Sequence, residues 1–254
     1  MQPMKLGGKV ALVTGASGGI GAAVAVALAS EGARVLLQYH RGESAVRKVL
    51  ARIPGGGHTA IRADLGVPEE AGRLIEGSLS ACGRLDLLVN NAGLFESHPP
   101  LSTPPAEWLE LWNRTLALNL TGAALLSYHA ARVMQASGGR IVNISSRGAF
   151  RGEPEAPAYG ASKAGMNAMS QSFAKALAPQ NILVFAVAPG WIDTVMAALS
   201  VNGPDGASIA AQSPLNRLGT PEEIAAIVLW LATDAPAFMT GAIIDANGAS
   251  YLRT

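Results

Sequence analysis

Tyr159 and Lys163 have side chains and a spacing that suit proton transfer. They stand at positions i and i+4 of the segment Tyr159-Gly-Ala-Ser-Lys163, so on a helix they would share one face. A strand candidate that ends in hydroxyl residues, Arg140-Ile-Val-Asn-Ile-Ser-Ser146, precedes them. In isolation the pair could be a surface tyrosine and a solvated lysine. A phosphate-binding motif upstream in the same chain favours a catalytic pair instead.

That motif is a glycine-rich loop near the N-terminus. Thr14-Gly15-Ala16-Ser17-Gly18-Gly19-Ile20-Gly21 follows the first strand candidate and leads straight into an Ala/Val-rich helix candidate. Glycine lets the backbone turn sharply and approach a pyrophosphate, and the N-terminus of the helix offers free N–H groups to the anion. The alternative is a purely structural turn, since the spacing Gly-x3-Gly-x-Gly differs from the better-known Gly-x-Gly-x-x-Gly.

The same residues also match Gly-x-Ser-x-Gly, the nucleophile elbow of α/β-hydrolases. Such an enzyme needs part of its sheet and an oxyanion loop before the elbow, yet only 14 residues precede Gly15. An acidic residue and then a histidine must also follow the elbow, and the last histidine is His129. We therefore reject the hydrolase interpretation.

With these motifs in order, the chain resembles the short-chain dehydrogenase/reductase family, in its single-domain form of about 250 residues. The resemblance covers nearly the whole chain. Its further motifs are Asp64 after the third strand candidate, Asn90-Asn91-Ala92-Gly93 after the fourth, Asn119 in a long helix candidate, and Pro189-Gly190 leading to Thr194. The interval 159 − 146 = 13 is the usual one in this family, which selects Ser146 over Ser145.

The resemblance implies four catalytic residues: Asn119, Ser146, Tyr159 and Lys163. Tyr159 would exchange a proton with the substrate oxygen, and Ser146 would donate a hydrogen bond to that oxygen. Lys163 would hold the nicotinamide ribose and favour the phenolate. A shift of the phenol pKa from about 10 to ~7 needs roughly 4 kcal/mol, about what one ammonium at ~4 Å supplies in an intermediate dielectric. Asn119 would seat a water that links Lys163 to solvent.

The resemblance also implies a nicotinamide cofactor, and the turn after the second strand candidate favours NADP(H) over NAD(H). An NAD enzyme of this fold usually has a carboxylate there, but this chain has Tyr39-His40-Arg41, as in the NADP-binding turn of pteridine reductases in the family. The alternative is a solvated basic turn, and Gly18 replaces an arginine common in NADP-preferring members. The expected cofactor contacts are Gly15, Ser17, Gly19, Ile20, Gly21, Tyr39, His40, Arg41, Asp64, Leu65, Asn91, Ala92, Gly93, Tyr159, Lys163, Pro189, Gly190, Ile192 and Thr194, with Asn90 also lining the cleft.

We expect a ketone reductase or alcohol dehydrogenase acting on a small, partly apolar molecule. The expected pocket draws on Leu94–His98, Arg147–Phe150, Pro154, Trp191 and a substrate lid over 195–214. Phe150 and Trp191 could stack on a substrate ring or simply pack, and His98 could bind substrate or be a solvated loop residue. One alternative is a 3-oxoacyl-[acyl-carrier-protein] reductase, although basic residues common in that group are replaced here by Ala136, Ser137 and Gln180. Another is a non-catalytic NADP-binding sensor, but such proteins commonly lose the Tyr or the Lys.

These residues need a scaffold, and short apolar runs alternating with Ala-rich amphipathic stretches predict an α/β fold. We expect one Rossmann-like domain over 1–254, with a doubly wound, seven-stranded parallel sheet covered by helices on both faces. The predicted strands are Val10–Thr14, Val35–Tyr39, Thr59–Ala63, Leu85–Asn90, Arg140–Ser145, Ile182–Ala188 and Ala242–Asp245. The predicted helices are Ile20–Glu31, Gly42–Ile53, Pro68–Ala81, Pro104–Ala136, Tyr159–Ala178 and Pro221–Thr233.

Composition limits the partners of this chain. The net charge is +1 and no basic run exceeds two residues, so we expect no nucleic acid partner. No stretch approaches the ~18 apolar residues of a membrane span, and the N-terminus does not resemble a signal sequence, which predicts a cytoplasmic protein without a membrane partner. The single Cys82 predicts no intrachain disulfide, and we expect no metal site.

The helix candidates 104–136 and 159–178 carry apolar residues on more faces than one sheet can cover, among them Leu116, Leu118, Leu120, Ala124, Leu125, Ala130 and Ala131. Family members typically pair these helices across a two-fold axis. We therefore expect a homotetramer, with a dimer as the second possibility and a monomer with exposed alanines as the third.

Overall fold

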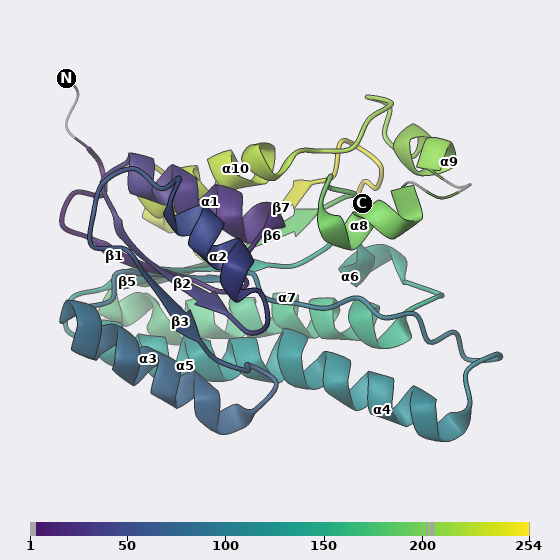
Figure 1. The fold of residues 1–254 in the computed structure, drawn as a ribbon, viewed down its shortest axis with the longest axis horizontal. Coiled ribbons are helices and arrows are strands. Elements are labelled where there is room, and N and C mark those ends of the chain that lie inside the picture. Colours follow the sequence, from purple (N-terminus) through teal and green to yellow (C-terminus); the bar gives the residue numbers. More distant parts are fainter. Residues whose placement is uncertain (1–3, 202, 204–205, 254) are drawn as a thin grey trace.

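A seven-stranded parallel sheet runs through the centre of the protein (Figure 1). The computed structural model describes residues 4–201, 203 and 206–253. The strand order is β3-β2-β1-β4-β5-β6-β7, so the chain reverses its direction of travel across the sheet between β1 and β4. All six pairings are parallel. The strands are β1 (Val10–Val13), β2 (Arg34–Tyr39), β3 (Thr59–Arg62), β4 (Leu87–Asn90), β5 (Gly139–Ile144), β6 (Ile182–Pro189) and β7 (Ile243–Ala246).

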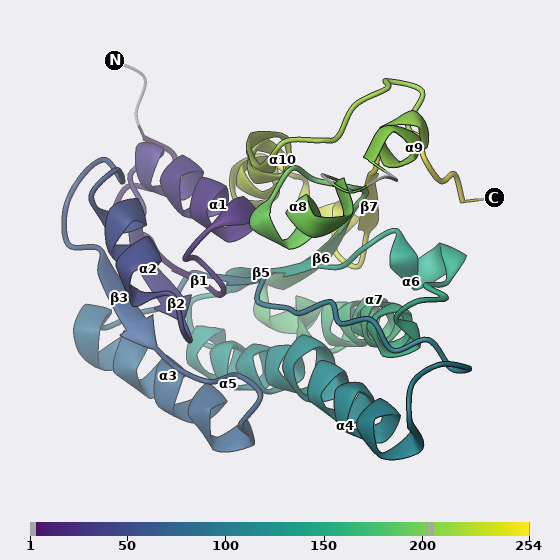
Figure 2. The ribbon, with the colours of Figure 1, turned by 45° about the vertical axis from the view of Figure 1, so that its right-hand side comes forward.

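Helices cover both faces of the sheet, as Figures 1 and 2 show from two directions. On one face lie α1 (Gly19–Ser30), α2 (Glu43–Leu50) and α10 (Pro221–Thr233), and on the other α3 (Pro68–Cys82), α4 (Pro105–Leu116), α5 (Ala123–Met134) and α7 (Pro157–Leu177). The shorter elements are η1 (Ala117–Gly122), α6 (Gly148–Arg151), η2 (Ala178–Gln180), α8 (Val195–Val201), α9 (Gly206–Ala211) and η3 (Ala237–Met239). The expected doubly wound α/β architecture is confirmed.

The alternation of side chains along each strand divides the core into two layers. Along β1, Ala11 and Val13 pack with Val24 of α1 and Val228 of α10. Val10 and Leu12 instead pack on the opposite side, in the layer that includes α3, α5 and α7. Every residue of β1, β4 and β6 is buried, and these strands are almost entirely apolar, which is why their positions could be predicted from the sequence.

The predicted helix Pro104–Ala136 is interrupted. The described chain forms α4, then one wide turn of π-helix (η1), then α5. A π turn adds a residue to the helical repeat, which the apolar periodicity of the sequence did not indicate. Gly122 lies in this turn, where a Cβ would come within 2.3 Å of Leu65 O, so the backbone of η1 packs directly on the loop after β3.

The segment expected to form a lid contains α8 and α9, two short helices above the carboxyl end of β6 (Figure 2). Residues 202, 204 and 205 of this segment lie outside the described residues. Within the described part of the chain, no helix combines the length and the apolar character that crossing a membrane requires.

Candidate active site

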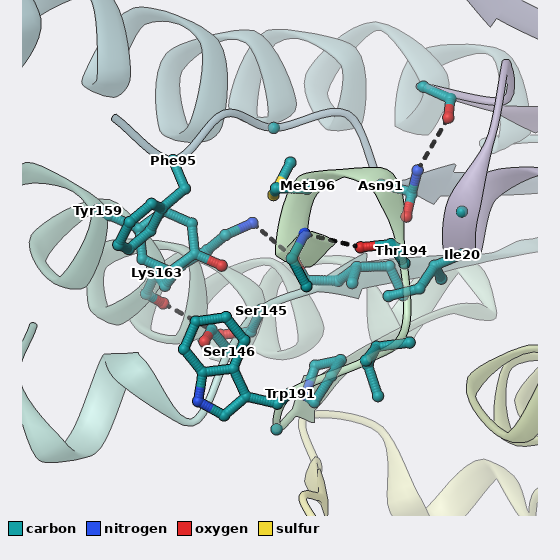
Figure 3. Close-up of a pocket in the computed structure, with 18 of the residues that line it drawn as sticks. Ile20, Asn91, Phe95, Ser145, Ser146, Tyr159, Lys163, Trp191, Thr194 and Met196 are labelled. Carbon is teal, nitrogen blue, oxygen red and sulfur yellow. Dashed lines mark hydrogen bonds between the residues drawn. The ribbon is translucent and has the colours of Figure 1, made fainter. Parts of the chain in front are cut away.

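The loops that follow β1, β4, β5 and β6 meet at the carboxyl edge of the sheet and enclose a cavity of about 400 Å³ (Figure 3). The edge lies beside the reversal point of the strand order, where open α/β sheets bind their ligands. Thirteen of the expected cofactor contacts line this cavity: Gly15, Ser17, Gly19, Ile20, Asn91, Ala92, Gly93, Tyr159, Lys163, Pro189, Gly190, Ile192 and Thr194. Ser146 also lines the cavity.

The glycine-rich loop has the conformation that its glycines allow. Gly15 and Gly19 have φ values of +62° and +53°, in the left-handed region that other residues rarely adopt. A Cβ on Gly15 would lie 2.9 Å from the Cα of Ala92, and one on Gly21 would lie 2.4 Å from Gly15 O. No side chain caps the N-terminus of α1, where Gly18 is the N-cap residue. The loop and this helix end therefore fit an anionic pyrophosphate, as expected for a dinucleotide.

Two polar residues outside the expected contacts, Thr14 and Gln38, hold this loop in place. The Thr14 hydroxyl accepts hydrogen bonds from Asn91 N and Ala92 N, both at 2.9 Å, and so joins the loops after β1 and β4. The buried Gln38 side chain accepts from Gly15 N at 2.8 Å and donates to Ala63 O at 2.7 Å. No local signal marks Gln38, because its role depends on the pairing of β1, β2 and β3.

Tyr159, Lys163 and Ser146 lie together in the wall of the cavity (Figure 3). The first turns of α7 present Tyr159 and Lys163 on one face, and the Lys163 Nζ lies 5.7 Å from the centroid of the Tyr159 ring. The ammonium donates to Ile144 O at 2.8 Å. Ser146 forms a side-chain hydrogen bond with Tyr159 and accepts another from Gly148 N at 3.0 Å. Ser145 instead donates to Lys163 O, so Ser146 is the serine that faces the phenol.

Burial acts on both titratable groups of this cluster. It raises the pKa of Tyr159, while the hydrogen bond with Ser146 lowers it and the charge of Glu153 raises it further. Burial lowers the pKa of Lys163 to about 8, so the side chain still carries its proton at neutral pH. The free protein therefore favours a neutral phenol beside an ammonium. The expected lowering of the Tyr159 pKa toward neutral pH is not present in the free protein and requires further positive charge.

Asn119 lies just behind this cluster. It is fully buried in η1, where its Oδ1 accepts from Leu94 N and its Nδ2 donates to Leu94 O, both at 2.9 Å. A Cβ on Gly93 would lie 3.3 Å from Asn119 Oδ1 and 3.6 Å from Lys163 Nζ, so Asn119 and Lys163 flank the same glycine. The predicted water relay from Lys163 through Asn119 stays a prediction.

The residues expected at the adenosine end lie beyond the cavity. His40 Nε2 and Asp64 Oδ2 are 3.5 Å apart, which brings the turns after β2 and β3 together. Arg41 is exposed and has no ion pair or hydrogen bond within the described part of the chain. A Cβ on Gly42 would lie 3.2 Å from Ser17 Oγ, so this turn also adjoins the glycine-rich loop.

Three expectations need correction. The Asn90 amide does not line the cleft, because it points into the core and donates to Asn143 Oδ1 at 2.8 Å and Ser127 Oγ at 2.9 Å. The Leu65 side chain is buried in the core, which leaves only its backbone to meet an adenine. His98 is neither solvated nor available to substrate: it is fully buried, and its Nε2 accepts from Ala158 N at 3.1 Å while its Nδ1 contacts Glu96 O.

The substrate end of the cavity has aromatic and charged walls. Phe95 packs edge-on against Tyr159 with ring centroids 5.1 Å apart, and Trp191 and Met196 also line the cavity (Figure 3). Arg147, Arg151 and Glu153 add charge to this wall. Of the other expected pocket residues, Phe150 packs under the guanidinium of Arg253, and Pro154 is exposed outside the cavity.

The residues present fit a nicotinamide dinucleotide. The glycine-rich loop of residues 15–21, here called the glycine cradle, suits a pyrophosphate, and it lines the same cavity as the buried Lys163 and Tyr159. Among the described residues, no group of three or more His, Cys, Asp or Glu side chains is placed to hold a metal ion.

Comparisons with known proteins agree with this geometry. A family profile described as "Enoyl-(Acyl carrier protein) reductase" matches residues 15–248. The chain is 38% identical over 251 residues to the 3-oxoacyl-[acyl-carrier-protein] reductase FabG of Aquifex aeolicus, covering 98% of this chain and 99% of the relative. It is also 38% identical over 244 residues to cis-4-hydroxycyclohexanecarboxylate dehydrogenase of Sinomonas cyclohexanicum, covering 94% and 95%. The crystal structure of a short chain dehydrogenase from Burkholderia cenocepacia in complex with NADP superposes with a TM-score of 0.88 at 32% identity, covering 97% and 99%.

Proposed function

Because the chain belongs to the short-chain dehydrogenase/reductase family of oxidoreductases, we propose that it is an NADP(H)-dependent ketone reductase with Tyr159 as its acid/base. The observation that carries this proposal is the single cavity that holds Ser146, Tyr159 and Lys163 at one end and the glycine cradle at the other. Relatives of equal identity are named for an acyl-carrier-protein substrate and for a cyclohexane hydroxy acid, so identity alone does not select the substrate.

The bound nicotinamide would supply or accept the hydride, and the residues of this chain manage the proton. In the reductive direction the carbonyl carbon gains the hydride and the carbonyl oxygen gains the Tyr159 proton, which yields a secondary alcohol and a phenolate. Ser146 donates a hydrogen bond to the same oxygen as negative charge develops on it. In the oxidative direction the phenolate takes the proton back from the alcohol.

Lys163 makes this exchange possible near neutral pH. Its pKa of about 8 keeps it charged at pH 7, and the ammonium favours the phenolate left after proton donation. We assign it a second role, hydrogen bonding to the nicotinamide ribose, because its Nζ lies on the cavity wall between Gly93 and Ile144. Asn119, bound to the backbone beside Lys163, is proposed to seat the water through which the proton reaches solvent.

We assign the 2′-phosphate of NADP(H) to the turn after β2. This turn has Tyr39 where an NAD enzyme usually has a carboxylate, and the exposed Arg41 is free to form a fork on a phosphate. Asp64, on the adjoining turn after β3, has its Oδ2 3.5 Å from His40 Nε2. The NADP complex of the Burkholderia cenocepacia relative supports this choice.

Two other functions are alternatives to the proposed ketone reductase, and experiments can distinguish them. The resemblance to FabG supports a 3-oxoacyl-carrier-protein reductase, but Ala136, Ser137 and Gln180 offer no charge to an acidic carrier protein. A non-catalytic sensor would have no need of the complete set Asn119, Ser146, Tyr159 and Lys163.

We further propose that 195–214 acts as a substrate lid, and that residues 104–136 and 159–178 form the interface of a homotetramer. Cytoplasmic location stays a prediction.

A screen of ketones and alcohols, followed by nucleotide absorbance with NADPH and NADP⁺, tests the proposal. Reduction of at least one ketone, lost on heat denaturation, is the expected result. Nucleotide binding without turnover of any carbonyl or alcohol would favour the sensor. Turnover restricted to acyl thioesters on a carrier protein would favour the carrier-protein reductase.

A further inference from the structure

Arg147, the residue after Ser146, is a buried cation that forms no ion pair with the described residues. Only 3% of its surface is exposed, and no carboxylate lies within 4.0 Å of it in the part of the chain that the structure describes. Its Nη1 is buried and has no hydrogen-bond partner among the described atoms. A buried arginine in this state is costly unless something else supplies acceptors. The side chain lines both the catalytic cavity and an adjoining one of about 250 Å³.

The charges around Arg147 leave an excess of one positive charge. Arg151 lies on the same wall, and its charge lowers the pKa of Arg147, which burial has already lowered, to about 10. Glu153 is the compensating carboxylate, and it is paired with Arg151 at 3.3 Å. Two guanidiniums against one carboxylate would attract one more negative charge.

Gln212 occupies the position where that charge would bind. Its Oε1 accepts from Arg147 Nη2 at 2.5 Å and from Arg151 Nη1 at 3.5 Å. The Gln212 amide oxygen is neutral and lies between two guanidiniums. A carboxylate oxygen in this position would bind more strongly, because a hydrogen bond between two charged groups is stronger than one to a neutral acceptor. Gln212 directly follows α9 in the proposed lid, and its side chain is exposed, so it can leave when substrate enters.

Trp191 adds a second unused donor to this wall. Its Nε1 is buried without a partner, and like Arg147 it lines both cavities. Arg147 Nη1 and Trp191 Nε1 are therefore two unsatisfied donors on residues shared by the two cavities. A ligand group that only accepts hydrogen bonds would satisfy them. A carboxylate is such a group, and its two oxygens match a guanidinium fork.

We propose that the substrate is an oxo acid or hydroxy acid, whose carboxylate displaces Gln212 and binds to Arg147 and Arg151. The inference rests on the proposed reductase function, since the other end of the same molecule places its carbonyl at Ser146 and Tyr159. Arg147 is then a specificity-determining residue. A neutral ketone of the same shape would leave the excess positive charge without a partner.

The test compares oxo acids with their carboxamides, which have nearly the same shape and no charge. The probes are 4-oxocyclohexanecarboxylate, 3-oxobutanoate and levulinate, each with its amide. Two quantities are measured for each pair: affinity for the enzyme–NADP⁺ complex by calorimetry, and kcat/KM by NADPH absorbance. The variants are Arg147→Met, Arg147→Lys, and Arg73→Met as the control, since Arg73 is an exposed residue of α3 paired with Glu70. Taking the acid-to-amide ratio cancels any general loss of folded or active enzyme.

For at least one pair, the wild-type enzyme should prefer the acid by about ten- to a hundredfold, the effect of one or two charge-assisted hydrogen bonds. Arg147→Met should bring the ratio close to one, Arg147→Lys should restore part of it, and Arg73→Met should leave it at the wild-type value. Absence of acid preference in every pair, or a preference that survives Arg147→Met, would overturn the proposal.

The two proposals fail in different ways. If an acid binds with dependence on Arg147 but is not reduced, the anion subsite stands and the reductase function fails. If neutral ketones are reduced as well as the acids, the reductase function stands and the subsite fails.

Discussion

Replacing Lys163 with methionine should stabilise the free protein below pH 8 while it damages the active site. Burial lowers the pKa of Lys163 from 10.5 to about 8, so the folded state disfavours the charged form. The free-energy cost of burying the charged Lys163 is present in full below pH 8. It shrinks as Lys163 loses its proton in the folded state, and it is absent above the pKa of 10.5 in the unfolded chain. Stability of the wild type should therefore rise with pH between about 8 and 10.5, relative to a variant without the lysine.

The shift from 10.5 to about 8 corresponds to roughly 3 kcal/mol at pH 7. Methionine removes this penalty but also the hydrogen bond to Ile144 O, which leaves a buried carbonyl unpaired at a cost of about 1–3 kcal/mol. The net gain at pH 7 is therefore small, on the order of 1 kcal/mol, or about 2–4 °C in Tm for a chain of this length. Above pH 10 the gain should become a loss, because only the hydrogen-bond term remains.

The assay is urea and thermal unfolding of the nucleotide-free proteins at equal concentration, at several pH values from 6 to 10.5. The matched control is Lys48→Met, an exposed lysine of α2 that lies outside the proposed subunit interface. The stability difference between wild type and Lys163→Met should change by roughly 3 kcal/mol across this range, and that of the control should stay flat. A stability difference for Lys163→Met that does not vary with pH would show that burial does not lower the pKa of Lys163, whatever the size of that difference.

Three further predictions follow from other parts of the molecule. Arg41→Ala should weaken NADPH about ten- to a hundredfold and leave NADH nearly unchanged, because one charge-assisted phosphate contact is lost; equal loss for both nucleotides in a binding titration would overturn the assignment. Light scattering at micromolar concentration should give about four times the chain mass of 26.0 kDa, whereas a mass near 26.0 kDa would contradict the tetramer. His98→Phe should lower the free energy of unfolding by about 1–3 kcal/mol, because Ala158 N loses its buried acceptor; unchanged urea unfolding would show that this bond does not hold the start of α7.

Most of the sheet could be predicted because its signals are local. Strands such as β1 and β6 are short apolar runs, and the glycines at positions 15, 19 and 21 mark the turn after β1 directly. Tyr159, Lys163 and Ser146 could be placed together because i,i+4 spacing on a helix and the end of a parallel strand each fix where a side chain lies.

Features that depend on contacts between distant segments could not be predicted in this way. The loop sequence around His98 gives no sign that α7 buries it and supplies its hydrogen-bond donor. Asn90 resembles a cleft residue in sequence, but partners on α5 and β5 draw its amide into the core. The π turn at η1 and the unpaired Arg147 likewise result from packing between elements, which leaves no periodic pattern in the sequence.

Tyr159→Phe is the sharpest test of Tyr159 as the acid/base, because it removes the proton donor and leaves the ring that packs on Phe95. The measurement is steady-state reduction of a ketone substrate beside NADPH affinity measured by fluorescence titration. We expect kcat to fall at least about a hundredfold, the usual contribution of a general acid, while NADPH affinity stays close to that of the wild type. Turnover within about tenfold of the wild type would contradict the assignment of Tyr159 as the acid/base.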